Sequence, residues 1–113
     1  MSEYTAYLRG INFRPEEARR IAKTLVEDQT LTLVREPGNP HDENAIQVIE
    51  PNTQMFIGYV AKEVAADLAP ELDEGKDYTC FVEANMAGSI LLNIVTNPGQ
   101  TLQSDDLTEE EPL

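Results

Sequence analysis

The sequence predicts a mainly β fold, a small and partly closed six-stranded β-barrel that carries two α-helices. Short stretches rich in Val, Ile, Leu and Tyr recur between turn-forming residues, which is typical of β-strands. Two segments with apolar residues at helical spacing interrupt these stretches. Because 113 residues suffice for one domain with its own core, and six short strands hardly stay an open sheet at that size, a partly closed barrel is the economical architecture.

The expected order of elements is β-α-β-β-β-α-β-β. The strands are expected at residues 4–13, 30–35, 44–49, 55–60, 78–86 and 89–95. The first helix opens at Pro15, whose fixed φ suits a first helical turn, and it ends at residues 28–29. Its apolar stripe consists of Ala18, Ile21, Ala22, Leu25 and Val26. The second helix starts near Ala61, Pro70 is expected to kink or end it, and Gly75 closes the segment.

The chain is strongly acidic. Twenty-one acidic residues against eight basic ones give a formal net charge of −13, a sign that disfavours non-specific attraction to phosphate. Five of the acids lie at residues 105–111 without a basic residue, and removing them from −13 leaves −8 on the rest. We therefore expect a folded domain at residues 1–98 and an acidic, mobile C-terminal tail at residues 99–113.

Cysteine and histidine usage argues against a disulfide, a metal site or catalysis. Cys80 is the only cysteine and lies in an apolar stretch, where a buried structural thiol is expected. His41 is the only histidine and no nucleophile accompanies it, so we expect no metal, no cofactor and no enzymatic activity. The longest apolar runs are too short to span a bilayer, so we expect no membrane partner and a cytoplasmic location.

The segment between the second and third expected strands is rich in residues that form turns. Residues 35–46 read Arg-Glu-Pro-Gly-Asn-Pro-His-Asp-Glu-Asn-Ala-Ile, where a plain hairpin needs only a two-residue turn. Pro37 and Pro40 restrict the backbone and reduce the entropy that the loop loses on ordering. Because rigid loops on strand scaffolds often carry binding residues, we predict that the functional centre lies here.

These residues resemble the signature of the HIRAN domain family. That signature begins with Arg, an acid and Pro, continues with Asn-Pro-aromatic-Asp and ends with Asn-Ala-Ile, as residues 35–46 do. A second family block, Gly with His or Tyr and an aliphatic run followed by a basic residue and an acidic helix start, is similar to residues 57–63. Arg9 matches an Arg at the end of the family's first strand. The likeness covers residues 4–96 and implies a barrel related to the oligonucleotide-binding fold, the OB-fold.

The resemblance also implies a function, because helicase-linked members of the family grip the 3′ end of single-stranded DNA. Carried over to this chain, Asp42, supported by Asn39, would accept a hydrogen bond from the terminal 3′-hydroxyl. His41 stands in place of the family's usual tyrosine and would contact the last base or sugar. The terminal nucleotide and its phosphates would be approached from the two other matching segments by Arg9, Tyr59 and Lys62.

Several of these positions also have structural interpretations. Asp42 alternatively holds the loop by bonding backbone N–H groups two residues on. Arg35 is next to Glu36 and close to Asp42, and it is expected to be an ion-pair partner. The other residues expected to shape the loop are Pro37, Pro40 and Asn44. Gly10 stands where eukaryotic members place an aromatic residue, and strand alternation leaves open whether Tyr7 or Phe13 supplies the ring instead.

We predict a non-enzymatic module that recognises the 3′-hydroxyl end of single-stranded DNA in DNA repair, replication or a mobile-element process, together with a helicase or nuclease partner protein. The alternative is an acidic protein-interaction module that keeps the HIRAN fold without DNA affinity, as a DNA mimic or a recruiter. Arg9 and Lys62 discriminate between the two. Their convergence beside Asp42 favours DNA binding, whereas pairing of each with neighbouring acids favours the alternative.

Overall fold

A computed structural model describes residues 1–98 of the chain, and the expected tail lies outside the described residues. The described part contains β1 (Ser2–Arg9), the 3-10 helix η1 (Ile11–Phe13), α1 (Glu16–Thr24), β2 (Thr32–Arg35), β3 (Ile46–Glu50), β4 (Met55–Val60), α2 (Lys62–Asp73), β5 (Tyr78–Met86) and β6 (Ser89–Thr96). Apart from η1, this is the predicted order of elements. None of the helices in residues 1–98 is both long and apolar enough to cross a membrane.

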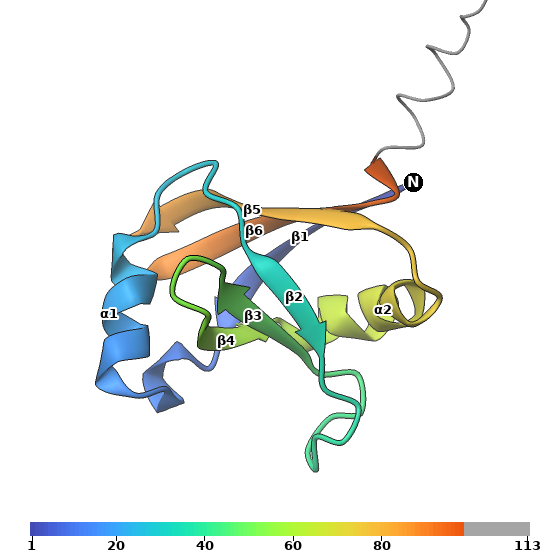
Figure 1. The fold of residues 1–113 in the computed structure, drawn as a ribbon, viewed down its shortest axis with the longest axis horizontal. Coiled ribbons are helices and arrows are strands. Elements are labelled where there is room, and N and C mark those ends of the chain that lie inside the picture. Colours follow the sequence, from blue (N-terminus) through green and yellow to red (C-terminus); the bar gives the residue numbers. More distant parts are fainter. Residues whose placement is uncertain (99–113) are drawn as a thin grey trace, which may run out of the picture.

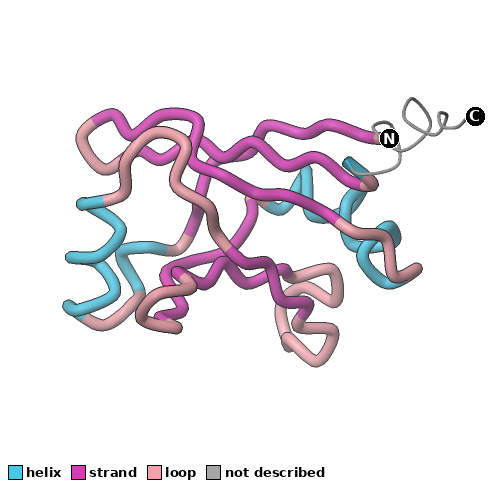
Figure 2. The backbone as a smooth tube through the Cα atoms, turned by 45° about the horizontal axis from the view of Figure 1, so that its top comes forward, coloured by secondary structure: helices cyan, strands magenta, loops and turns pink. Residues whose placement is uncertain are grey.

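The six strands form one antiparallel sheet in the order β2-β3-β4-β1-β6-β5. The sheet curls into a half-barrel, with α1 and α2 at opposite ends (Figures 1 and 2). Its two outer strands approach each other, because the segment that precedes β2 bonds to β5. The Leu31 N–H donates to the Cys80 carbonyl at 2.9 Å, and the Val82 N–H donates to the Gln29 carbonyl at 2.9 Å. The prediction of a small, partly closed barrel with two helices is confirmed.

The core fills the space enclosed by the curled sheet and the two helices. Its largest fully buried side chains belong mostly to strands and are Ile46, Val48, Ile57, Leu68, Cys80, Val82, Ile90, Leu92, Ile94 and Thr96. The buried faces of the helices carry mainly alanine, at Ala18 and Ala22 in α1 and at Ala65 and Ala69 in α2. Small side chains let the helix backbones lie close to the sheet.

The first strand is shorter than expected. β1 ends at Arg9 rather than at Phe13, because Gly10 takes a left-handed conformation with φ of 78° and the chain turns into η1. A glycine adopts this conformation without the steric cost that other residues incur. Phe13 therefore leaves the sheet and is 90% exposed.

Both helices also differ from expectation at their ends. α1 stops at Thr24 because Leu25 is already extended, with ψ of 140°, so Val26 of the expected stripe is 62% exposed. In α2, Pro70 does not end the helix, which continues to Asp73. The carbonyl that Pro70 leaves without an intrahelical donor belongs to Ala66, and both residues are exposed, so water can take the place of the missing N–H.

Glu71 ties α2 to the sheet. Its carboxylate accepts hydrogen bonds from the Tyr4 hydroxyl of β1 and, at 2.8 Å, from the fully buried Thr96 hydroxyl of β6. Lys76 Nζ lies 3.4 Å from the same carboxylate. The Tyr4 hydrogen bond, more than the others, lowers the pKa of Glu71 to about 2. Glu71 is therefore ionised in the folded protein at any pH near neutrality.

The pairing between β1 and β4 is short and tightly fitted. It joins the two halves of the sheet through only two residue pairs, Leu8 with Val60 and Arg9 with Tyr59. A Cβ atom added at Gly58 would lie 2.7 Å from the Arg9 carbonyl oxygen and 2.9 Å from Leu8 Cδ1, so only glycine fits there. We call this contact between β1 and β4 the seam.

Substitution of Glu71 should make stability depend less on pH. Glu71→Gln should lower the free energy of unfolding by about 1–3 kcal/mol at neutral pH, because hydrogen bonds to a charged group are lost. Since the folded pKa lies below the ordinary value of 4.5, the difference between the two proteins should persist above about pH 4.5 and shrink as the pH falls toward 2. Urea titrations across this range measure it. Glu74→Gln, at a 64% exposed side chain just after the end of α2, is the control and should change little.

Substitution of Gly58 should open the seam. Gly58→Ala should cost about 1–3 kcal/mol of stability, because the new methyl group overlaps the β1 backbone, which cannot move aside as a flexible side chain could. Gly38→Ala is the matched control, because nothing lies within 4 Å of a Cβ added there. Thermal unfolding compares the two variants, and an equal melting temperature for both would contradict the close fit at Gly58.

Candidate functional site

The six residues that the sequence assigns to DNA binding line one cleft of about 410 Å³. They come from the end of β1, the loop between β2 and β3, the end of β4 and the first residue of α2, and they are Arg9, Asn39, His41, Asp42, Tyr59 and Lys62. We call this the Asp42 cleft. Segments up to 53 positions apart in sequence therefore meet at one site (from Arg9 to Lys62).

The seam sets the position of three of these residues. The β1–β4 register places Arg9 directly beside Tyr59. One residue beyond β4, the Ala61 N–H donates to the Tyr7 carbonyl at 3.1 Å, which fixes the point where α2 begins. Lys62, the first residue of α2, is thereby held at the same edge as Arg9.

Asn39 organises the tip of the β2–β3 loop. Its Oδ1 accepts hydrogen bonds from the backbone N–H groups of His41 at 2.8 Å and Asp42 at 3.1 Å. Its Nδ2 donates to the Tyr59 hydroxyl at 3.3 Å, so the loop is bonded to β4. Asp42 in turn accepts the Asn44 N–H on Oδ1 at 2.9 Å. Asn39 and Asp42 thus both shape the loop and face the cleft.

Arg35 fastens the other end of the loop. Its guanidinium donates to the carbonyls of Ala45 at 2.8 Å and Glu43 at 3.1 Å, which closes the loop on itself. It forms a two-point ion pair with Asp73 of α2, with distances of 2.9 Å and 3.2 Å. Arg35 is thus an ion-pair partner, and its carboxylate comes from α2 rather than from the adjacent loop acids.

A second hydrogen-bond network, centred on Glu36, holds the Tyr59 hydroxyl. The Tyr59 hydroxyl donates to Glu36 Oε1 at 2.8 Å, and Gln47 Nε2 donates to the same oxygen at 3.0 Å. The Tyr59 hydrogen bond, followed by that of Gln47, lowers the pKa of Glu36. Burial and the neighbouring Glu36 carboxylate raise the pKa of Tyr59, so this pair stays an anion and a neutral phenol near neutrality.

The charged groups of the cleft are not neutralised by each other within residues 1–98. Asp42 uses Oδ1 for the loop, and no hydrogen-bond donor of the described residues reaches its Oδ2. Among the same residues, neither Arg9 nor Lys62 forms an ion pair with a carboxylate, and the Arg9 guanidinium lies 5.5 Å from the centre of the Tyr7 ring. The cleft therefore offers the free oxygen of Asp42, the Glu63 carboxylate and two cations to a ligand.

Sequence reasoning missed four residues of this site. Ala45 and Val60 add apolar wall, and Glu63 adds a second acid at the start of α2. Glu36 does not line the cleft but positions Tyr59. The Arg-acid-Pro start of the loop signature was the signal that could have identified Glu36, because the signature specifies an acid at that position.

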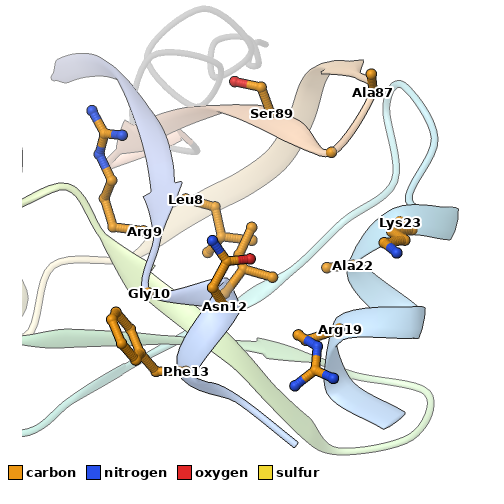
Figure 3. Close-up of a pocket in the computed structure, with 12 residues that line it drawn as sticks. Leu8, Arg9, Gly10, Asn12, Phe13, Arg19, Ala22, Lys23, Ala87 and Ser89 are labelled. Carbon is orange, nitrogen blue, oxygen red and sulfur yellow. The ribbon is translucent and has the colours of Figure 1, made fainter. Parts of the chain in front are cut away.

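Neither aromatic residue that was considered as a substitute at Gly10 lines the Asp42 cleft. Tyr7 lies on the outer face of β1, where the Arg9 guanidinium covers it. Phe13 lines a neighbouring cleft instead, which Figure 3 shows beside Gly10 and α1.

Comparisons with known proteins agree with this fold. The family model described as the HIRAN domain matches residues 3–96. Helicase-like transcription factor of Oryctolagus cuniculus is 46% identical over 46 residues, which cover 41% of this chain and only 4% of that protein. The chain thus spans a small fraction of the length of that curated relative.

Three solved structures share the fold of this chain at lower sequence identity. The crystal structure of the HIRAN domain of human HLTF has a TM-score of 0.68 and 23% identity, over 84% of this chain and 74% of that one. A protein from Lactobacillus plantarum has a TM-score of 0.74 and 22% identity, over 84% and 97%. The NMR structure of the HLTF HIRAN domain in its DNA-bound conformation has a TM-score of 0.59 and 23% identity, over 91% and 84%. The chain belongs to the HIRAN domain family.

Proposed function

We propose that this protein is a non-enzymatic module that binds the 3′-hydroxyl end of single-stranded DNA in the Asp42 cleft. The observation that carries the proposal is the convergence of Arg9 and Lys62 beside Asp42, with no carboxylate of residues 1–98 paired to either cation. DNA repair, replication or a mobile-element process, with a helicase or nuclease partner, is the context in which a module for strand ends has a use.

Asp42 supplies the preference for an end. Its Oδ2 accepts a hydrogen bond from a free 3′-hydroxyl, which only the terminal nucleotide has. The same carboxylate repels a 3′-phosphate, and an internal nucleotide offers an ester oxygen without a proton. Asn39 keeps the carboxylate in place through the backbone of the loop.

The cations and rings of the cleft supply affinity. Arg9 and Lys62 approach the phosphates that precede the terminal nucleotide. No side chain caps the start of α2, so its backbone N–H groups add partial positive charge there. Tyr59 and the exposed His41 provide surfaces for the sugar and base. Stacking on such rings tolerates any base sequence.

The alternative of a protein-interaction module rests on the net charge of −13. In that case Arg9 and Lys62 should be paired with acids, and within residues 1–98 they are not. The HLTF HIRAN domain, a structural relative, is known in a DNA-bound conformation, which also supports the DNA proposal.

End recognition should appear as selectivity for the 3′-hydroxyl. Fluorescence anisotropy with 5′-labelled oligothymidylates should show binding of the 3′-hydroxyl form, with the 3′-phosphate form weaker by about tenfold or more, because the phosphate is repelled by Asp42. Equal affinities would mean ordinary single-strand binding. Absence of binding to either form at low salt would favour the protein-interaction module.

Substitution of Asp42 by asparagine should reduce that selectivity without unfolding the loop. Asp42→Asn keeps an oxygen for the Asn44 N–H but removes the negative charge, so the 3′-phosphate form should bind more tightly than it does to the natural protein. Glu43→Gln removes the same charge one position away, outside the cleft, and serves as the control. A similar gain in both variants would show that only net charge matters, and an equal melting temperature for all three proteins would exclude a folding effect.

A further inference from the structure

Cationic side chains are concentrated between the end of β1 and the end of α1. Residues 9–23 contain five of the eight basic residues of the chain and only two acids, Glu16 and Glu17. This segment therefore has a net charge of +3 in a chain of −13. The five are Arg9, Arg14, Arg19, Arg20 and Lys23. A surface of this sign on an acidic protein is a local attraction for anions.

Three of these cations line a second cleft of about 520 Å³. It lies between the end of β1 with η1, the helix α1, and the turn between β5 and β6. We call it the Phe13 cleft. Arg9 lines both this cleft and the Asp42 cleft, so the two adjoin at the end of β1. In Figure 3 the Phe13 ring lies on the same side of the β1–η1 backbone as the Arg9 side chain, and Arg19 and Lys23 lie on the other side, along α1.

The cations of this segment differ in how far the fold uses them. Arg14 donates to the Phe56 carbonyl at 3.0 Å and lies 3.8 Å above the Phe56 ring, so it is structural. Arg19 donates through one nitrogen to the Arg14 carbonyl at 2.6 Å. Lys23 is exposed, and no hydrogen bond or ion pair joins its ammonium group to the described residues. Lys23 and the rest of the Arg19 guanidinium therefore face the cleft without a carboxylate from residues 1–98.

Phe13 gives the cleft an exposed aromatic surface. Its side chain is 90% exposed, more than any other large apolar residue in the described part of the chain. The left-handed turn at Gly10 directs the backbone away from the sheet immediately before η1, which is why the ring is not buried. An exposed ring beside a cationic groove is the combination that binds single-stranded nucleic acid.

We propose that the Phe13 cleft binds the nucleotides that precede the 3′ end, with Phe13 stacking on a base and Arg19 and Lys23 contacting phosphates. A strand leaving the Asp42 cleft meets Arg9 at the shared wall and then Phe13, and it crosses the β1–η1 backbone to reach the cations of α1. This inference rests on the proposed function, because the strand is oriented by its end in the Asp42 cleft. Phe13 thereby offers an upstream nucleotide the aromatic surface that Gly10 lacks.

The first test compares oligonucleotide lengths. A 3′-hydroxyl oligothymidylate of about three nucleotides should occupy only the Asp42 cleft, whereas one of about 12 lies within the range that a barrel of the OB type covers. In the full chain, Phe13→Ala should lower the affinity for the longer strand at least about fivefold, the equivalent of ~1 kcal/mol of stacking. The affinity for the shorter strand should be unchanged. Phe13→Tyr should retain affinity and Phe13→Leu should lose it. Met86→Ala, at another exposed apolar residue outside the cleft, is the control.

A second test measures charge and contact separately. Lys23→Gln should reduce the salt dependence for the longer strand by about 0.7 in the slope of log affinity against log salt, the value for one phosphate of a single strand. Arg20→Gln removes the same charge from the same helix outside the cleft and should not. Because the chain contains no tryptophan, Phe13→Trp introduces a single reporter whose fluorescence should be quenched by the longer strand and not by the shorter one.

The outcomes separate this inference from the proposed function. Selective binding of 3′-hydroxyl ends with equal affinity for both lengths, or without any effect of Phe13→Ala, would overturn the upstream contact and leave end recognition standing. Failure of every oligonucleotide to bind would overturn both.

Discussion

The seam between β1 and β4 is the contact on which the site depends. Only two residue pairs join the halves of the sheet there, and the absence of a side chain at Gly58 lets the strands approach. This approach sets Arg9 beside Tyr59, and the Ala61 hydrogen bond to β1 then fixes where α2 starts. Because this contact is short, the sheet curls there, and the ends of β1 and β4, the β2–β3 loop and the start of α2 meet at one edge. The Asp42 cleft results from that curl, because its residues come from all of these elements.

The polar groups of the Asp42 cleft are oriented before any ligand arrives. Asn39 bonds two backbone N–H groups of the loop and the Tyr59 hydroxyl, and Tyr59 is held in turn by Glu36. Arg35 joins the loop to α2 through Asp73. Because these bonds already fix the loop, a ligand of this cleft does not have to meet the entropy cost of ordering it, and more of the contact energy remains for affinity. The shifted pKa values of Glu36 and Tyr59 keep this support in one protonation state near neutrality.

Local patterns were sufficient for the element order, the partly closed barrel and the loop, because alternation and turn-forming residues act over a few positions. The ends of elements were predicted less well. β1 stops where Gly10 turns left-handed, and α1 stops where Leu25 becomes extended, and neither is visible in the spacing of apolar residues. The family resemblance brought six residues to one site, but partners distant in sequence could not be read from it. Arg35 finds its carboxylate 38 positions away, in Asp73. Phe13 needed the structure to show that it is exposed beside a second cleft.

The acidic composition and a nucleic-acid ligand are compatible once charge is considered by position. At physiological salt, interactions between exposed charges are largely screened beyond about 8 Å, so a phosphate senses the groups nearest to it rather than the total of the chain. Residues 9–23 and Lys62 supply cations around the two adjoining clefts, while acids elsewhere would repel the rest of a strand. A uniformly basic protein would bind DNA along its whole length. In the proposed function, an acidic body with cations gathered around these clefts would confine the strand to them, and Asp42 would then select a free hydroxyl. On this proposal the net charge contributes to selectivity for ends, because it lowers the affinity for strands in general.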